Sequence, residues 1–345
     1  MQEESKRYNR HLKLDKVGLE GQKNLSSTSV LVIGAGGLGC PVMQSIVSAG
    51  IGRVGIVDGD VVSESNLQRQ FLYSLKDVGE SKCIVVGQKL GVLNPLVNIE
   101  THDYFINDDN ILKVMEGYDI VADCTDNMDT KYLINDAAVR LGKPVIFGAL
   151  HTFQGQFGVY NFENSKTYRC IFPNNQTKSE PQNCSDIGVW SVLPGIIGTM
   201  QANEILKIAA GLDGVLADKI GIYDAFSGGM QLVTVKRNEL QVTEALKRNF
   251  NKDSIESRRL SKTEFLLRAQ SKDSIVVDLR HLKNEAAVHS ALEVDAGKIN
   301  VWKREIHRDK EVLLFCNRGN TSLKILKELI QDGYNAFDLR RGMNN

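Results

Sequence analysis

An apolar strand that runs directly into a glycine-rich turn is the feature of this sequence that most limits its fold. Residues 29–33 are an apolar run, the turn that follows is Gly34-Ala-Gly36-Gly37-Leu-Gly39, and residues 41–49 have the pattern of a helix. Glycines at these spacings allow a tight turn and a close approach of the backbone to a ligand, and the N-terminus of the helix favours a phosphate. This order predicts the start of a parallel sheet that binds a nucleotide.

The alternation of strands and helices continues along the chain. Further strands are predicted over 52–58, 98–103, 118–124 and 144–149, separated by helices over 82–93 and 128–141. Later runs predict strands over 156–162, 219–224 and 231–237, the first with antiparallel alternation, and a helix over 194–210. The prediction is an α/β fold with a doubly wound, Rossmann-like sheet and an antiparallel extension.

The chain of 345 residues is long enough for two domains. A polar, charged stretch over 241–261 is predicted to link a first domain over 1–240 to a second over 262–345. The second domain restarts a small α/β pattern, with strands predicted over 274–279, 311–315 and 336–339 and a helix over 321–331.

The balance of charge excludes some classes of partner. Lys and Arg number 42, as do Asp and Glu, so we expect no nucleic acid or membrane partner attracted by bulk charge. There is no apolar run of 18 residues and no signal peptide, which predicts a cytoplasmic location. The six cysteines are widely spaced, so a disulfide framework is not expected.

Polar residues after the glycine-rich turn suggest which nucleotide binds. Asp58 ends the second predicted strand, where it suits a ribose hydroxyl, and a dehydrogenase that binds NAD could supply all of this. A nicotinamide site has no need, however, of Arg69, Lys82 and the second carboxylate Asp126. A triphosphate needs all three, because cations stabilise phosphate charge and a carboxylate can hold Mg²⁺.

Several motifs together resemble the ThiF/MoeB/HesA family, the bacterial relatives of ubiquitin-activating enzymes, over about residues 5–237. They are Arg7-Tyr8-x-Arg10-His11, the glycine-rich turn, Asp58-Gly-Asp60, Ser65-Asn-Leu-x-Arg69-Gln70, Lys82 and Asp123-Cys-Thr-Asp126-Asn127. The resemblance implies a homodimer that uses ATP and Mg²⁺ to adenylate the C-terminal Gly-Gly carboxylate of a ubiquitin-like sulfur-carrier protein of the ThiS or MoaD type.

The resemblance also implies a role for each matching residue. The glycine-rich turn (Gly34, Gly36, Gly37, Gly39) surrounds the nucleotide, Asp58 and Asp60 lie beside it, and the phosphates are lined by Ser65, Asn66, Arg69 and Lys82. Asp126 is implied to hold Mg²⁺ and act as the catalytic carboxylate, with Asn127 beside it, and Arg10 to reach the ATP site of the partner subunit. Asp60 and Asn127 could instead form turns, and Arg10 could be a solvated surface charge.

Two further cysteines bear on the resemblance. Cys184 lies in a polar stretch where family members often have a cysteine that forms a thioester or acyl-disulfide with the carrier, although it could be a spectator. Many members also hold a structural zinc with two C-x-x-C pairs. Here Thr167 replaces the first cysteine and Cys170 remains, but the segment over 237–242, where the second pair is expected, has no cysteine. One cysteine of the four cannot make that site, so we expect no zinc. We expect the loop that carries Cys170 to be held by packing alone.

Cys316 follows the apolar strand of the second domain and begins the loop Cys316-Asn-Arg-Gly319-Asn-Thr-Ser322. Loop amides and the following helix would favour a thiolate and hold a persulfide. With Val276-Val-Asp278-Leu-Arg280 and Leu339-Arg-Arg-Gly342, this segment resembles a rhodanese domain over about 262–345. It is predicted to be shortened, because the usual segment between the first strands is not recognisable in 281–303. The alternative is a degenerate domain kept for docking.

The leading hypothesis is an ATP-dependent adenylyltransferase with sulfurtransferase activity. It would receive sulfur from a persulfide donor such as a cysteine desulfurase and pass it from Cys316 to the activated carrier. An NAD-dependent oxidoreductase, a non-catalytic scaffold that binds a ubiquitin-like protein, and an enzyme that activates a tRNA carbonyl are the alternatives. The motifs do not distinguish thiamine, molybdenum cofactor, cysteine and tRNA thiolation pathways.

Overall fold

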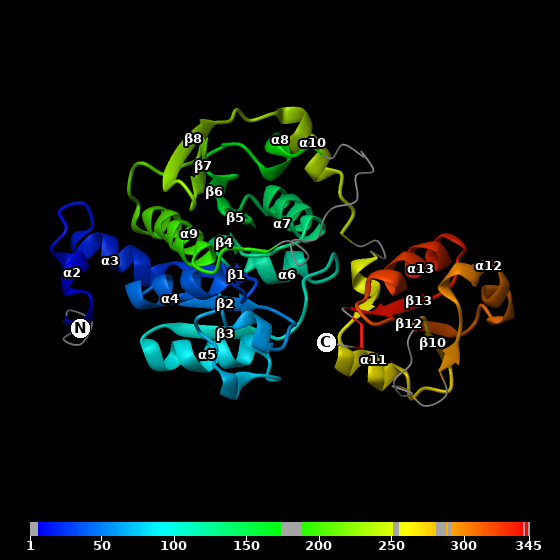
Figure 1. Cartoon of the computed structure of the whole chain (residues 1–345). Helices are drawn as coiled ribbons and strands as arrows, with labels where there is room; N and C mark the ends of the chain where they lie inside the picture. The colour runs from blue at the N-terminus through cyan, green and yellow to red at the C-terminus, as the bar shows by residue number, and fades with distance from the viewer. Residues whose placement is uncertain are drawn as a thin grey trace. The chain divides into compact units, whose positions relative to one another are not determined.

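The structure is a computed structural model that describes residues 6–173, 188–250, 255–280, 288, 291–340 and 342–343. It divides into two compact units, Met1–Ile106 with Asn110–Phe250, and Asn107–Asp109 with Asn251–Asn345 (Figure 1). Within the described residues, none of the helices combines the length and the apolarity that crossing a membrane would require.

The first unit is built on an eight-stranded sheet with the strand order β3-β2-β1-β4-β5-β6-β7-β8. The first five strands in this order are parallel and the last three are antiparallel additions. The α/β prediction with an antiparallel extension is therefore confirmed. The strands are β1 (Ser29–Ile33), β2 (Arg53–Val57), β3 (Asn98–His102), β4 (Ile120–Asp123), β5 (Val145–His151), β6 (Gln154–Tyr160), β7 (Lys219–Asp224) and β8 (Gly229–Thr234).

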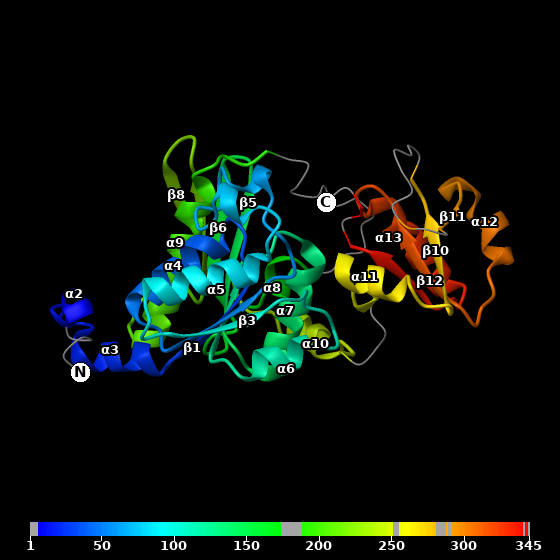
Figure 2. The same cartoon turned by 90° about the horizontal axis from the view of Figure 1, so that it is seen from below.

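Helices cover both faces of this sheet, which explains why its central strands are continuous apolar runs. Along β1, Val30 and Val32 enter one buried cluster, whereas Leu31 and Ile33 enter the other. Figure 1 and Figure 2 show the helices that lie along the sheet. Helices α4 and α9 contribute to the first cluster, and α6 and α7 to the second. The helices are α2 (Asn9–Leu12), α3 (Gly18–Ser27), α4 (Gly39–Ala49), α5 (Lys82–Leu93), α6 (Ile111–Glu116), α7 (Met128–Leu141), α8 (Tyr168–Ile171), α9 (Leu193–Ala210) and α10 (Glu239–Leu246).

The segment suggested as a linker, 241–261, is largely structured where it is described. Most of it up to residue 250 belongs to the first unit, because α10 packs on α7 and Phe250 enters the core between the sheet and α7. Its other end belongs to the second unit, where β9 (Arg259–Leu260) joins the sheet. Polar composition suggested the linker, and within its described part the apolar side chains of Phe250 and Leu260 pack into the cores of the two units. The domain boundaries stay a prediction.

The second unit is built on a parallel sheet of five strands with the order β11-β10-β12-β13-β9. Buried clusters cover both faces of it, with Val277 and Leu314 in one and Val276 and Leu313 in the other. The other elements are β10 (Ser274–Asp278), β11 (Leu292–Glu293), β12 (Glu311–Phe315), β13 (Ala336–Leu339), α11 (Lys262–Arg268), α12 (Ile299–Trp302) and α13 (Asn320–Gln331).

Candidate functional site

Three loops that carry predicted site residues leave the sheet of the first unit at the same edge. Strand β1 lies between β2 and β4, and Ile33 is in register with both Val57 and Asp123. The residues that follow these three ends begin the glycine-rich turn, the Asp58 loop and the loop that carries Asp126. The carboxyl edge of a parallel sheet is where ligands bind in such folds.

The glycine-rich turn packs so closely on its surroundings that two of its positions exclude any side chain. Gly34 has φ +101°, and a Cβ there would lie 2.7 Å from the carbonyl oxygen of Cys124. A Cβ at Gly39 would collide with the carbonyl oxygen of Gly34. Tyr73, which no motif singled out, donates a hydrogen bond of 2.8 Å to the carbonyl of Ala35 and supports the turn.

Asp58 is tied to this turn by its carboxylate. Its Oδ2 accepts a hydrogen bond of 2.7 Å from the amide of Ala35, and its Oδ1 accepts one of 2.8 Å from the amide of Asp60. Burial raises the pKa of Asp58, the nearby Asp60 carboxylate raises it further, and Lys82 opposes both. Asp58, which is predicted to bind the ribose, therefore also stabilises the conformation of the glycine-rich turn.

Lys82 and Asp60 form a buried ion pair beside the turn. The Lys82 Nζ lies 3.2 Å from Asp60 Oδ2, and the two side chains are 5% and 9% exposed. The amide of Lys82 also donates to the Asp60 carbonyl at 2.9 Å, at the first turn of α5. Lys82, which the resemblance implies for the phosphates, thus has a carboxylate partner in this structure, and Asp60 does more than form a turn.

The loop of Ser65, Asn66 and Arg69 follows Asp60. Ser65 is exposed and its hydroxyl lies 3.1 Å from that of Ser63. Arg69 is half-buried and donates one guanidinium N–H to the Ser65 carbonyl at 3.1 Å. A guanidinium has five N–H donors, so this bond orients the group and does not exhaust it.

Asp126 and Asn127 lie in the turn between β4 and α7. Asp126 is exposed, and its carboxylate has no hydrogen bond or ion pair with any of the residues that the structure describes. The Asn127 Oδ1 accepts a hydrogen bond of 2.8 Å from the amide of Thr130, so Asn127 is the N-cap of α7. Asn127 therefore has a structural role in this turn, and its contact with the nucleotide stays a prediction.

Lys131 is a residue near this turn that no motif singled out. It is buried and makes an ion pair with Asp123 at the end of β4. A signal was present in the sequence, because a lysine four residues after the cap of a helix lies on the same face as the cap.

Arg10 is not brought to the nucleotide site of its own chain. Asn94, at the C-terminal end of α5, donates a hydrogen bond of 2.9 Å to the Tyr8 hydroxyl, and the Tyr8 ring packs on Gly50. Gly50 caps the end of α4 opposite the glycine-rich turn. The 11 residues of α4 span about 16 Å, and Arg10 itself is exposed.

Hydrogen bonds from backbone amides surround Cys170. Its sulfur accepts hydrogen bonds from the amides of Thr167 and Asn238, both at 3.3 Å. Among the described residues, His, Cys, Asp and Glu form no group of three or more that could hold a metal ion. The expectation that packing alone holds this loop was wrong, because hydrogen bonds also hold it. Besides the two bonds to Cys170, Arg237 donates to the Ser165 carbonyl at 3.0 Å.

Lys166 adds a second cross-link to the same region. Its Nζ donates to the carbonyls of Val159 at 3.0 Å and Ala217 at 2.8 Å, and the side chain is fully buried. Burial lowers the pKa of Lys166 to about 8. Cys184, in contrast, lies outside the described residues.

The second unit surrounds Cys316 with hydrogen-bond donors. The amides of Gly319 and Ser322 point at its sulfur, at 3.1 and 3.4 Å, as α13 begins. The Ser322 hydroxyl donates to Asp338 at 3.1 Å, and all three side chains are buried. A Cβ at Gly342, with φ +74°, would collide with the Cys316 carbonyl, so this turn closes against the cysteine loop.

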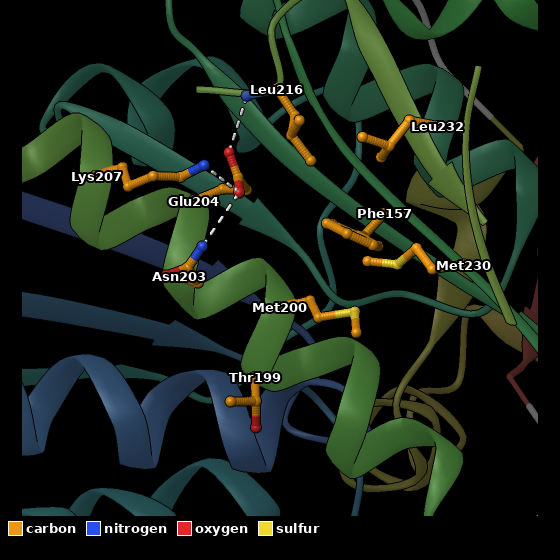
Figure 3. A pocket seen from close by; sticks show the side chains of 9 residues that line it. All are labelled: Phe157, Thr199, Met200, Asn203, Glu204, Lys207, Leu216, Met230 and Leu232. Carbon is orange, nitrogen blue, oxygen red and sulfur yellow. Dashed lines mark hydrogen bonds and ion pairs between the residues drawn. The ribbon is translucent and has the colours of Figure 1, made fainter. Parts of the chain in front are cut away.

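A groove on the first unit contains none of the predicted site residues. It lies between α9 and strand β8, has a volume of about 380 Å³, and is lined mainly by apolar side chains. Figure 3 shows Met200, Met230 and Leu232 around it, with Glu204 held by Lys207 on the side of α9. Its position does not coincide with the carboxyl edge of the sheet.

Comparisons with known proteins agree with this geometry. The model of the ThiF family matches residues 8–244. The sulfur carrier protein adenylyltransferase of Thermus thermophilus is 45% identical over 241 residues, which are 68% of this chain and 89% of that protein. The adenylyltransferase and sulfurtransferase MOCS3-2 of Zea mays is 32% identical over an alignment of 374 residues that covers 98% of this chain and 78% of that protein.

Coverage differs among the relatives. The chain spans about half the length of several other curated relatives, such as the adenylyltransferase and sulfurtransferase MOCS3 of Xenopus laevis, which is 43% identical over 67% of this chain and 51% of that protein. Among solved structures, E. coli MccB with ATP shares the fold, with a TM-score of 0.59 and 22% identity over 67% of this chain and 71% of that one. The chain therefore belongs to the ThiF family.

Proposed function

We propose that this chain uses ATP to adenylate the C-terminal Gly-Gly carboxylate of a ubiquitin-like sulfur-carrier protein. The observation that carries the proposal is the meeting of the glycine-rich turn, Asp58 and the exposed Asp126 at one edge of the sheet. Two cations follow Asp58 in the chain, Arg69 in the next loop and Lys82 at the first turn of α5. The names of two relatives, the sulfur carrier protein adenylyltransferase of Thermus thermophilus and the probable molybdopterin-synthase adenylyltransferase of Porphyra purpurea, support an adenylation reaction.

The proposed reaction joins two anions. A carboxylate oxygen of the carrier attacks the α-phosphorus of ATP, and pyrophosphate leaves with the electron pair of the broken P–O bond. Arg69 and Lys82 lower the barrier by stabilising charge on the phosphates, and the glycine-rich turn holds the nucleotide close to the backbone. Asp60 keeps Lys82 at the start of α5, where its buried ammonium meets little competition from water.

Asp126 suits the Mg²⁺ that such a reaction needs. It is an exposed carboxylate at the carboxyl edge of the sheet, and Mg²⁺ binds one or two carboxylates together with substrate phosphates. When bound, the ion supplies positive charge to the phosphates. We propose no zinc, because Thr167 and Cys170 offer a single thiolate.

Sulfur transfer is the second part of the proposal. The amides of Gly319 and Ser322 suit a persulfide on Cys316. Its terminal sulfur attacks the carbonyl carbon of the acyl-adenylate and AMP leaves, which gives an acyl-disulfide. A second thiol then attacks the Cys316 sulfur and releases the thiocarboxylate, and Cys184 is our candidate for that thiol. This step leaves a Cys184–Cys316 disulfide, which a cellular thiol reductant must reduce with two electrons before a desulfurase-type persulfide donor can reload Cys316.

We also propose that Arg10 acts across a homodimer, because it lies at the far end of α4 from its own nucleotide site. We also propose the two domains predicted from the sequence and a location in the cytoplasm. A location in the cytoplasm would place the thiols in a reducing compartment.

Mass spectrometry of the carrier tests both steps. Incubation with a Gly-Gly-ended carrier, ATP and a persulfide donor should give a carrier C-terminus heavier by the exchange of oxygen for sulfur. Cys316→Ala should leave ATP–pyrophosphate exchange intact and abolish the thiocarboxylate, with Cys170→Ala as the matched control. Asp126→Ala should abolish both. Thermal stabilisation by NADH but not by ATP–Mg²⁺ would favour an oxidoreductase instead.

A further inference from the structure

A buried lysine–aspartate pair lies directly behind the turn that carries Asp126. The Lys131 Nζ is 3.3 Å from both carboxylate oxygens of Asp123 and 2.9 Å from the carbonyl of Gly148. The Lys131 and Asp123 side chains are 5% and 3% exposed. The ammonium also lies over the Phe147 ring, 4.6 Å from its centroid, so this cation faces protein and not the nucleotide.

Asp123 connects this pair to the loop itself. Its Oδ1 accepts hydrogen bonds from the amide of Thr125 at 3.0 Å and from the Thr125 hydroxyl at 2.7 Å. One carboxylate thereby joins the end of β4, the middle of the loop and, through Lys131, the second turn of α7. Two residues further on, the cap formed by Asn127 fixes the start of the helix.

The position of Asp126 depends on these anchors. Its own carboxylate has no partner among the described residues, so its backbone neighbours decide where it points. Thr125 precedes it and is held by Asp123, and Asn127 follows it and is held by its cap. Lys131 supplies the countercharge that a buried carboxylate needs, and the same Asp123 carboxylate accepts both bonds from Thr125.

We propose that Lys131 and Asp123 are positioning residues that hold the Asp126 carboxylate where Mg²⁺ and ATP require it. The proposal rests on the adenylation function proposed above. Partners of a metal-binding group commonly change metal affinity or activity by roughly 10- to 100-fold when they are removed, and small misplacements of a reacting group cost as much.

A purely structural role is the competing explanation, and the physics of buried ion pairs separates the two. Replacing both partners of a buried pair by apolar residues often restores stability, whereas removing one partner does not. The double variant Asp123→Leu/Lys131→Met should therefore fold but lose both hydrogen bonds to Thr125. Thr125→Val removes only the hydroxyl bond and leaves the ion pair intact.

The experiment compares these variants of the full chain with Lys166→Met, which alters another buried lysine that lies outside the proposed site. Hydrogen–deuterium exchange of the peptide around 123–128 is measured without ligand, and the Mg²⁺ concentration for half-maximal ATP–pyrophosphate exchange is measured with a Gly-Gly-ended carrier. We expect faster deuterium uptake and a Mg²⁺ requirement raised roughly 10- to 100-fold in the double variant. Thr125→Val should change both in the same direction, and Lys166→Met neither.

Wild-type deuterium uptake and a wild-type Mg²⁺ requirement in Thr125→Val and in a folded double variant would overturn the proposal. If the double variant does not fold, the outcome for Thr125→Val alone decides. Absence of exchange activity in the wild type would refute the adenylation function. The deuterium uptake of the variants would still show whether the pair holds the loop.

Discussion

The Lys82–Asp60 pair predicts that a residue proposed for catalysis is also needed for stability. Lys82→Met leaves the Asp60 carboxylate, 9% exposed, without the ammonium 3.2 Å away. Loss of one partner from a buried pair costs about 3–5 kcal/mol. In a domain of this size each kcal/mol lowers Tm by about 2–4 °C, so we expect the transition of the first unit to fall by roughly 6–20 °C.

Two further variants separate stability from catalysis. Asp60→Leu/Lys82→Met removes both charges and should recover most of the lost Tm, but it should not recover ATP–pyrophosphate exchange, because the cation is absent. Lys89→Met breaks an ion pair with Asp77 that is partly exposed, and should cost about 1 kcal/mol or less. Calorimetry of each variant is the measurement. An unchanged Tm in Lys82→Met would refute the argument from burial.

Three other predictions test the structure away from this pair. Burial lowers the pKa of Lys166 to about 8 from 10.5, so between these pH values the unfolded chain holds a proton that the native state lacks. Wild type should then gain about 3 kcal/mol over Lys166→Met as pH rises through that window, and urea unfolding without such a trend would contradict it. A chelator should leave Tm unchanged, and loss of stability on chelation would reveal a metal. Cys170→Ala should cost only about 0.5–1.5 kcal/mol, because one of the two amides that lose the sulfur as acceptor is exposed to water. Arg10→Ala should lower adenylation, and mixing it with Asp126→Ala should recover part of the activity if Arg10 acts across a dimer; no recovery would count against that arrangement.

Local sequence was sufficient for the elements that lead into the site. Strand β1, the glycine-rich turn and α4 are contiguous, and each residue choice there agrees with the geometry next to it. Asn127 and α7 were predictable for the same reason, since a cap lies beside the helix that it starts. Short helices such as α6 and α10 were missed, because helices of this length owe their stability to tertiary packing.

Sequence alone therefore determined the family, the parallel sheet and which residue types gather at its carboxyl edge. Only the tertiary structure decided how those residues pair. Lys82 meets Asp60 across 22 positions, and Cys170 receives the amide of Asn238 across 68. It also placed Arg10 at the far end of α4. Contacts of this kind depend on strand register and helix packing, which bring residues distant in the sequence within hydrogen-bond distance. The local sequence around a buried charge or thiol therefore does not identify its partner.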